Sequence, residues 1–259
     1  MKIKVGIPIA FDAEAWSLLG IRSWRRFDGR AVCTIALPCG TEIVALRSGV
    51  GLEKGLEGAR WLVREGVHAL VSVGVASGLR RDLGTGDLIV GSRVIEEENE
   101  EESKSWESTP ACSKPACEAL LGEGIPAKEG PIVSVKSPVS TPKEKADLYR
   151  RSHALVSDME SSSIARTAAE ANLPFLAVRA VIDPPQRKVE PDLSSCLDQH
   201  GRICFPVLWR NLCRRPSLFP ELLVMTRDLA IALQTLRRAW GAQVRHTLPA
   251  MLGDRKFRR

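Results

Sequence analysis

One stretch of the sequence, residues 158–183, reads DMESSSIARTAAEANLPFLAVRAVID. Its first half predicts a helix from Glu160 to Ala171, because small and apolar residues recur there at helical spacing. Asn172 and Pro174 supply the end of that helix. Its second half, Phe175 to Ile182, is a nearly continuous apolar run, which is typical of a central strand covered on both faces. The stretch therefore indicates an α/β protein.

Two carboxylates take distinctive positions in this stretch. Glu160 falls at the start of the predicted helix, and Asp183 falls directly after the predicted strand, where two prolines turn the chain. Open α/β sheets hold ligands at helix starts and past strand ends, so we expect both acids to face one site. Local sequence leaves simpler explanations open: an acid is favoured in a first helical turn, and Asp often begins a turn. Asp158 also has the position of a helix cap.

The rest of the chain supports the same fold class. Helix patterns such as residues 52–65 alternate with strand-like runs. These runs are residues 2–9, 32–37, 42–46, 69–73 and 87–94. We predict a three-layer α/β/α sandwich with a central mixed sheet. The 259 residues, 44% of them hydrophobic, can form one compact domain. We place it at residues 1–240, with C-terminal helices from about 199, followed by a flexible basic tail at 241–259.

The net charge of +6 is concentrated at the C-terminus. Residues 237–259 contain seven Lys or Arg residues and one Asp, so the body of the chain is neutral overall. This distribution, without any zinc-finger or RNA-binding motif, argues against a nucleic-acid-binding protein. The amphipathic pattern of residues 218–240 predicts a helix that packs on the sheet or on a second subunit. Peripheral contact of the basic tail with an anionic membrane is the alternative to a merely solubilising role.

The Cys and His residues argue against a metal site. The four His residues form no ligand motif, and the pair Cys112 and Cys117 lacks a second pair of zinc ligands. Seven cysteines, and the lack of a signal-type apolar core before Asp12, predict a cytoplasmic protein in a reducing environment. No apolar run reaches membrane-spanning length.

Four further segments carry glycine turns or an acidic turn in a specific order along the chain. They are KVGIPIAFDAE at 4–14, VALRSGVG at 44–51, VGVASGL at 73–79 and LGTGDLIV at 83–90. Together with Met159 and Glu160 at the helix start and Asp183 after the next strand, they resemble the nucleoside phosphorylase and nucleosidase superfamily of the purine and uridine phosphorylase type. The resemblance covers most of residues 1–185. It implies a homo-oligomeric, pentosyl-transferring enzyme without a metal or organic cofactor.

The resemblance assigns roles in cleaving a purine N-glycosidic bond. Asp183 would hydrogen-bond N7 of adenine as a protonated acid, which requires a pKa raised by an apolar pocket. Glu160 would accept hydrogen bonds from the ribose 2′ and 3′ hydroxyls, and Met159 would lie along the sugar. Glu14 matches the position that nucleosidases use to orient or deprotonate attacking water. Further substrate contacts are expected from Asp158, Val75, Ala76 and Gly78.

Inorganic phosphate is the co-substrate that the phosphorylase members imply. Its expected site consists of Arg47, Ser48, Gly49 and Gly51. Glycines let backbone N–H groups approach an anion closely, and an Arg side chain can pair with it. The sequence departs from the family pattern around Gly74, where Ser72 and Val75 replace an Arg and a Ser. Ile182 likewise replaces the Ser that often precedes the catalytic Asp. Water as the attacking group is therefore open beside phosphate.

The C-terminal third carries a looser pattern of Pro, Arg and Leu residues. The segments are DPP at 183–185, EPD at 190–192, GRI at 201–203 and LCRRPSLFPELL at 212–223. They resemble the hopanoid-associated phosphorylase branch, which is thought to remove adenine from adenosylhopane. Our first hypothesis is therefore phosphorolysis of adenosylhopane in hopanoid side-chain biosynthesis. The alternatives are a hydrolytic methylthioadenosine or adenosylhomocysteine nucleosidase, and a non-catalytic nucleoside- or lipid-binding protein.

Overall fold

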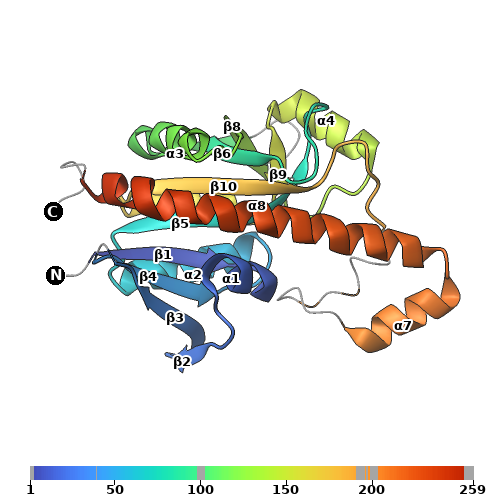
Figure 1. Cartoon of the computed structure of the whole chain (residues 1–259), viewed down its shortest axis with the longest axis horizontal. Coiled ribbons are helices and arrows are strands. Elements are labelled where there is room, and N and C mark those ends of the chain that lie inside the picture. The colour runs from blue at the N-terminus through green and yellow to red at the C-terminus, as the bar shows by residue number, and fades with distance from the viewer. Residues whose placement is uncertain are drawn as a thin grey trace.

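The structure is a computed structural model of the chain (Figure 1). It describes residues 3–38, 40–97, 103–190, 196, 198 and 204–253, and for residues 110, 111 and 242–253 it describes the backbone alone. The strands are β1 (Lys4–Ile9), β2 (Arg25–Phe27), β3 (Arg30–Ala36), β4 (Glu42–Arg47), β5 (Ala69–Gly78), β6 (Leu88–Glu97), β7 (Ser103–Glu107), β8 (Ala127–Ser134), β9 (Val156–Asp158) and β10 (Phe175–Asp183). The helices are α1 (Asp12–Leu19), α2 (Leu52–Arg64), α3 (Pro110–Gly122), α4 (Pro142–Ser152), α5 (Ser161–Glu170), α7 (Phe205–Arg214) and α8 (Leu218–Gly253).

One mixed sheet runs through the molecule, and part of it closes on itself. Among the described strands the order is β10-β6-β8-β9-β5-β1-β4-β3-β2, with β7 paired to β6 and β10 paired to β5 as well. Strands β5, β10, β6, β8 and β9 therefore form a closed ring. Within the ring, Asp183 of β10 is in register with Ser77 of β5, and Ser77 is in register with Ser157 of β9. Three strand ends are thereby brought together.

Helices cover both faces of this sheet. On one face, α8 lies along β10 and contacts α3 and α1 (Figure 1). On the other face, α2 and α5 contact each other and pack on the strands. Successive strand residues point to opposite faces, so Val71 joins an apolar cluster with Leu236 of α8, while Leu70 joins one with Ile164 of α5. This arrangement confirms the predicted α/β fold with a central mixed sheet.

The predicted elements match the observed ones best where the apolar run is long. The helix at 160–171 is α5, and the strand at 175–182 is β10. Strand β5 continues past the predicted end at residue 73 and reaches Gly78, which carries it into the site. The short strands β2 and β9 and the polar helix α4 were not predicted, because a few residues or a mostly charged sequence give no clear periodicity.

The C-terminal boundary needs a correction. Helix α8 begins at Leu218 as predicted, but it continues past Trp240 to Gly253, so the predicted start of a flexible tail at 241 is not a helix end. Extending a helix that has already formed has a small free-energy cost, because each further residue adds one backbone hydrogen bond. The C-terminal helices expected from about 199 begin with α7 at Phe205, and residues 199–203 and 254–259 lie outside the described residues.

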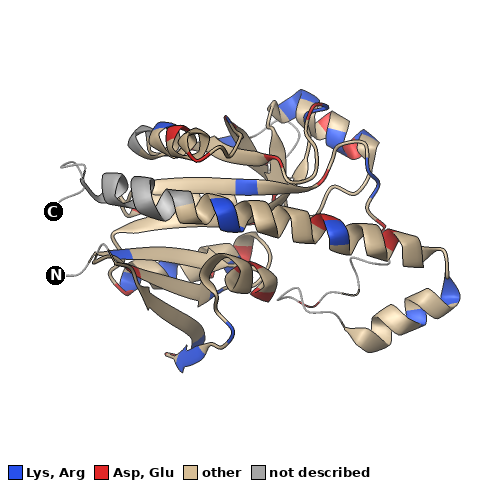
Figure 2. Cartoon of the chain, in the orientation of Figure 1, with Lys and Arg blue, Asp and Glu red and all other residues tan. Residues whose placement is uncertain are grey.

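Charged residues are spread over the described surface. Lys and Arg alternate with Asp and Glu along α4 and α8 (Figure 2), which agrees with a neutral body. Among the described helices, none has the length and apolarity that crossing a membrane requires. The described residues also contain no group of three His, Cys, Asp or Glu side chains that could hold a metal ion.

Candidate active site

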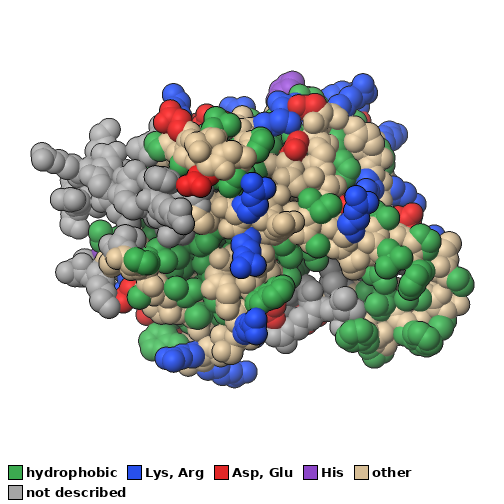
Figure 3. Space-filling model, in the orientation of Figure 1, with side chains coloured by type: hydrophobic (Ala, Val, Ile, Leu, Met, Phe, Trp, Pro, Cys, Tyr) green, Lys and Arg blue, Asp and Glu red, His purple; other side chains and the backbone are tan. Residues whose placement is uncertain are grey.

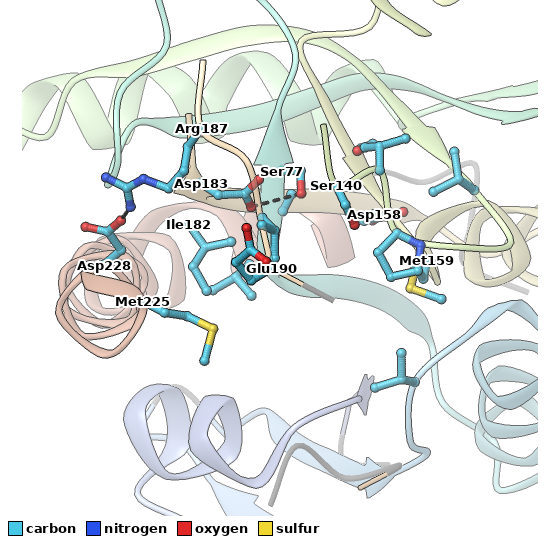
Figure 4. Close-up of a pocket in the computed structure, with 18 of the residues that line it drawn as sticks. Ser77, Ser140, Asp158, Met159, Ile182, Asp183, Arg187, Glu190, Met225 and Asp228 are labelled. Carbon is cyan, nitrogen blue, oxygen red and sulfur yellow. Dashed lines mark hydrogen bonds and ion pairs between the residues drawn. The ribbon is translucent and has the colours of Figure 1, made fainter. Parts of the chain in front are cut away.

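A cavity of about 390 Å³ opens where the ends of β5, β9 and β10 meet. This volume lies within the range of small-molecule sites. Asp183, Asp158 and Met159 surround it, and Met225 of α8 approaches from another side (Figure 4). The wall residues are Phe11, Val50, Val75, Ala76, Ser77, Val135, Pro138, Val139, Ser140, Ser157, Asp158, Met159, Glu160, Ile182, Asp183, Arg187, Lys188, Val189, Glu190, Asp198, Glu221, Val224, Met225 and Asp228.

Asp183 ends β10 and faces this cavity. Its carboxylate accepts a hydrogen bond from the Ser77 hydroxyl at 2.9 Å (Figure 4) and forms a short ion pair with the Lys145 ammonium. Burial raises the pKa of Asp183, and the Lys145 charge and the two hydrogen bonds oppose that rise. Asp183 thus combines a cavity position with a proton-carrying partner, which suits a group that transfers a proton to a bound ligand.

Lys145 was not predicted from the sequence. It lies in the highly charged helix α4, and its side chain is completely buried. Besides Asp183, its ammonium donates to the backbone carbonyls of Pro184 at 3.1 Å and Arg187 at 3.0 Å. The one sequence signal is helical spacing, because Lys145 lies three residues before the buried Leu148 and so shares its inward face.

Glu160 lies at the start of α5 and reaches the same cavity, as the sequence predicts. One carboxylate oxygen accepts a hydrogen bond from the Gly51 backbone N–H at 2.8 Å. Burial, and then the neighbouring charge of Asp158, raise the pKa of Glu160 to about 7, while the Gly51 N–H and the Arg179 charge oppose the rise. Glu160 is therefore held from one side and can accept further hydrogen bonds from a ligand.

Asp158 is tied to a buried ion pair beneath the site. The Arg179 guanidinium donates to Asp158 at 2.8 Å and also to the hydroxyls of Ser72 at 2.6 Å and Ser161 at 2.8 Å. Both charged side chains are almost fully buried. Arg179, which the sequence showed only as an interruption of an apolar strand, places a positive charge near Glu160 and fixes the turn that carries it.

Glu14 lies just behind the cavity wall rather than in it. Its carboxylate accepts backbone N–H bonds from Val75 at 3.0 Å and Phe11 at 3.2 Å, and both of these residues line the cavity. Gly74 allows this approach, since a Cβ at that position would lie 2.5 Å from a Glu14 carboxylate oxygen. Burial raises the pKa of Glu14, and the two N–H bonds and the Arg179 charge oppose it. In the described structure Glu14 therefore does not line the cavity directly, and a role as general base requires the attacking water to reach its carboxylate between Phe11 and Val75.

The other predicted substrate contacts divide into two groups. Val75, Ala76 and Met159 line the cavity as predicted. Gly78 is not among the wall residues within the described chain, and instead a Cβ there would lie 3.2 Å from Pro185 and 3.3 Å from the Asp183 carbonyl. Gly78 therefore supports the turn after β10 by letting it pack closely, which is an indirect role.

The predicted phosphate site is not assembled at the cavity. In the described part of the chain the wall includes none of Arg47, Ser48, Gly49 and Gly51. Arg47 pairs with Asp12 at 3.5 Å, and the Ser48 hydroxyl donates to backbone carbonyls. The Gly51 N–H is engaged by the Glu160 carboxylate. Arg47, Ser48 and Gly51 thus each already have an acceptor within the protein, so they do not form the expected group of donors at the cavity.

The protein is thus of the α/β class, with buried acids gathered at a cavity of small-molecule size where β9 and β10 end. A sequence model of the phosphorylase superfamily matches residues 6–199, so the chain belongs to that superfamily. The 5′-methylthioadenosine/S-adenosylhomocysteine nucleosidase of Staphylococcus saprophyticus subsp. saprophyticus is 27% identical over 156 residues, 55% of this chain and 68% of that protein. The corresponding nucleosidase of Maridesulfovibrio salexigens is 25% identical over 174 residues, 61% of this chain and 73% of that protein.

Solved structures share the fold. A crystal structure of the Helicobacter pylori 5′-methylthioadenosine/S-adenosyl homocysteine nucleosidase superposes with a TM-score of 0.74 at 18% identity, covering 94% of this chain and 98% of that chain. Futalosine hydrolase of Helicobacter pylori gives a TM-score of 0.73 at 18% identity, covering 95% and 98%. At this identity the likeness concerns the fold alone.

Proposed function

We propose that the protein cleaves the N-glycosidic bond of an adenosine derivative and releases adenine, with water as the attacking group. The observation that carries this proposal is the meeting of Glu160 and Asp183 at one cavity between strand ends. Membership of the phosphorylase superfamily supports the reaction class, and the nucleosidase relatives support adenine as the base.

Each buried acid takes one part of the reaction. Asp183 donates a proton to N7, so that adenine leaves as a neutral base. Glu160 accepts hydrogen bonds from the ribose hydroxyls and so holds the sugar as positive charge develops on it. Glu14, behind the wall at Val75, takes a proton from the attacking water.

Water is favoured over phosphate by the charges around the cavity. A bound phosphate dianion needs cationic side chains or free N–H groups. Of the wall cations, Arg187 forms an ion pair with Asp228 (Figure 4), and Lys188 pairs with Glu190 at 2.9 Å. Arg47, expected at phosphate, pairs with Asp12 instead. A neutral nucleophile has no such requirement.

The cavity also favours a substrate with an apolar 5′ substituent. Ile182, Val224 and Met225 form an apolar part of its wall. Beyond Val224, exposed apolar side chains gather over α7 and the start of α8 (Figure 3), with Phe205 73% and Trp209 72% exposed. Such a patch stabilises a hydrocarbon that extends out of the cavity. Adenosylhopane, which the C-terminal sequence pattern suggests, is the substrate we propose.

A second candidate is a small 5′-thio substituent, as in methylthioadenosine, which the identity to the nucleosidases favours. The test is to measure adenine by chromatography after incubation with adenosylhopane and with methylthioadenosine, each with and without phosphate. We expect release from adenosylhopane that does not change when phosphate is removed. Phosphate-dependent release would establish phosphorolysis, release from methylthioadenosine alone would favour the second candidate, and no release from either would indicate a non-catalytic binding protein.

A further inference from the structure

All hydrogen bonds that the structure shows for the Lys145 ammonium are directed at the end of β10 and the turn after it, which carry Asp183. Its side chain has no exposed surface, and its ammonium donates to Asp183 and to the carbonyls of Pro184 and Arg187. An ammonium has three N–H donors, so these three acceptors use all of them. Burying a lysine is costly unless its charge is paired, and a residue needed only for packing would be apolar, as Leu148 is on the next turn of α4.

We propose that Lys145 is a positioning residue for departure of the base: it holds the Asp183 carboxylate at the cavity and supplies the proton that Asp183 passes to the leaving purine. This inference rests on the proposed function, because it names the source of the proton in that reaction. It assigns no contact between Lys145 and the substrate.

In hydrolysis, every proton that is transferred has a donor and an acceptor. As the bond between C1′ and N9 breaks, its electron pair moves into the purine, and N7 becomes basic. One proton moves from Lys145 Nζ to Asp183 and from Asp183 to N7, which leaves a neutral Lys145 amine and an Asp183 carboxylate. The attacking water forms the bond to C1′ and loses a proton to Glu14. After adenine leaves, solvent returns a proton to Lys145 and accepts the one on Glu14.

Other groups around the pair are already engaged. Ser77 of β5 donates to Asp183, and Arg187, after β10, contributes a positive charge but is paired with Asp228 of α8. The remaining charged residues of the cavity wall are Asp158, Glu160, Lys188, Glu190, Asp198 and Glu221. Asp158 is paired with Arg179 and Glu190 with Lys188, so Lys145 is the proton donor in direct contact with Asp183 besides the Ser77 hydroxyl.

The test is the pH dependence of kcat in Lys145→Met. In the native enzyme Lys145 brings an additional proton to its pair with Asp183, whereas in the variant the transferable proton is carried by Asp183 alone. We therefore expect the alkaline limb of kcat to move down by more than about one pH unit, with a loss of roughly a hundredfold at pH 8. Lys143→Met, at an exposed position on the same helix, should leave the alkaline limb and the value of kcat at pH 8 unchanged.

A second variant separates the proton from the hydrogen bonds. Lys145→Gln keeps amide donors for the carbonyls but carries neither the charge nor the proton, so it should show the same displaced alkaline limb. A uniform loss of kcat at every pH in both variants, or native kcat in Lys145→Gln, would overturn the proposal.

A stability measurement distinguishes this inference from the proposed function. Removing Lys145 takes away the main opposition to burial, so the folded-state pKa of Asp183 rises further above its unfolded value than it does in the native protein. The variant therefore loses more stability than the native protein as pH rises from the unfolded pKa to this higher folded pKa. The Tm difference between native protein and Lys145→Met should therefore grow from about pH 4 upward and then level off. A Tm difference independent of pH would overturn the charge pair itself. If the native protein releases no adenine but this difference does grow, the proposed function alone has failed.

Discussion

Among single residues, burial raises the pKa values of three carboxyl groups at or behind the cavity wall. Burial raises the pKa of Asp183, Glu160 and Glu14, and charged or hydrogen-bonding neighbours oppose each of these rises. Asp183 has an ammonium, whereas Glu160 and Glu14 have backbone N–H groups. The acid with the cationic partner is the one to which the proposed function assigns proton donation.

The first residue-scale prediction concerns Asp183. Asp183→Asn should lower kcat by about a hundredfold or more, because an amide cannot deliver the proton to the base. The measurement is steady-state adenine release, with circular dichroism to verify folding. Asp82→Asn, at an exposed ion pair, serves as the control. Native turnover in Asp183→Asn would refute the assignment.

Burial raises the pKa of Glu160 to about 7, which predicts a pH dependence of catalysis. Its ionised form accepts hydrogen bonds from the sugar, so kcat/KM should fall about tenfold per pH unit as pH drops below that value. In Glu160→Gln this acid limb should disappear, and kcat/KM at pH 8 should be roughly tenfold or more below native. The matched control is Glu170→Gln, at an exposed position of the same helix. An acid limb that persists in Glu160→Gln would assign the titration to another group.

Among the elements, strand β10 contains a buried positive charge, and polar side chains of the neighbouring elements pair with it. Arg179 lies in the middle of β10, and Asp158, Ser72 and Ser161 reach it from β9, β5 and α5. Arg179→Met should destabilise the fold by about 3–5 kcal/mol, because it leaves the buried Asp158 carboxylate without its cationic partner. Urea unfolding measures this. Arg151→Met, which removes an exposed pair with Glu97, should change stability by less than about 1 kcal/mol.

The contact between β5 and α1 gives a further element-scale prediction. Gly74→Ala would place a Cβ 2.5 Å from a Glu14 oxygen, so Glu14 must move. We expect a loss of about 1–3 kcal/mol in stability and at least a tenfold loss of kcat. Gly84→Ala is the control, since no atom lies within 4 Å of its new Cβ. Full activity in Gly74→Ala would argue against a role for Glu14 at its observed position.

Over the whole molecule, Val224 belongs both to the cavity wall and to the exposed apolar side chains of α7 and α8, so we expect an apolar substituent to leave the cavity along it. For a series of 5′-alkylthioadenosines, kcat/KM should therefore rise by up to about fourfold per added methylene, which corresponds to about 0.8 kcal/mol per buried group. Val224→Glu should flatten this dependence, whereas Leu121→Glu, exposed on α3, should not. A flat dependence in the native enzyme would exclude an apolar substituent from this path.

The elements with long apolar runs, and the two acids next to them, could be predicted from the sequence. Glu160 and Asp183 could be placed because each adjoins a strong helix or strand pattern. The position of a residue at the start or end of such an element indicates which edge of the sheet it occupies. The superfamily resemblance likewise depended on local motifs around glycines and acids, whose order survives in the chain.

The partners of these acids follow from the tertiary structure and could not be read from the sequence. Lys145 and Asp183 are 38 residues apart, and they meet because β5, β10, β6, β8 and β9 close into a ring, with α4 lying between β8 and β9 in the chain. The same closure brings Arg179 to Asp158, and the parallel pairing of β4 with β1 places Arg47 opposite Ile9, close to Asp12 at the start of α1. Periodicity in a sequence reports which face of an element is buried, whereas an ion pair depends on where two distant elements are brought together in space.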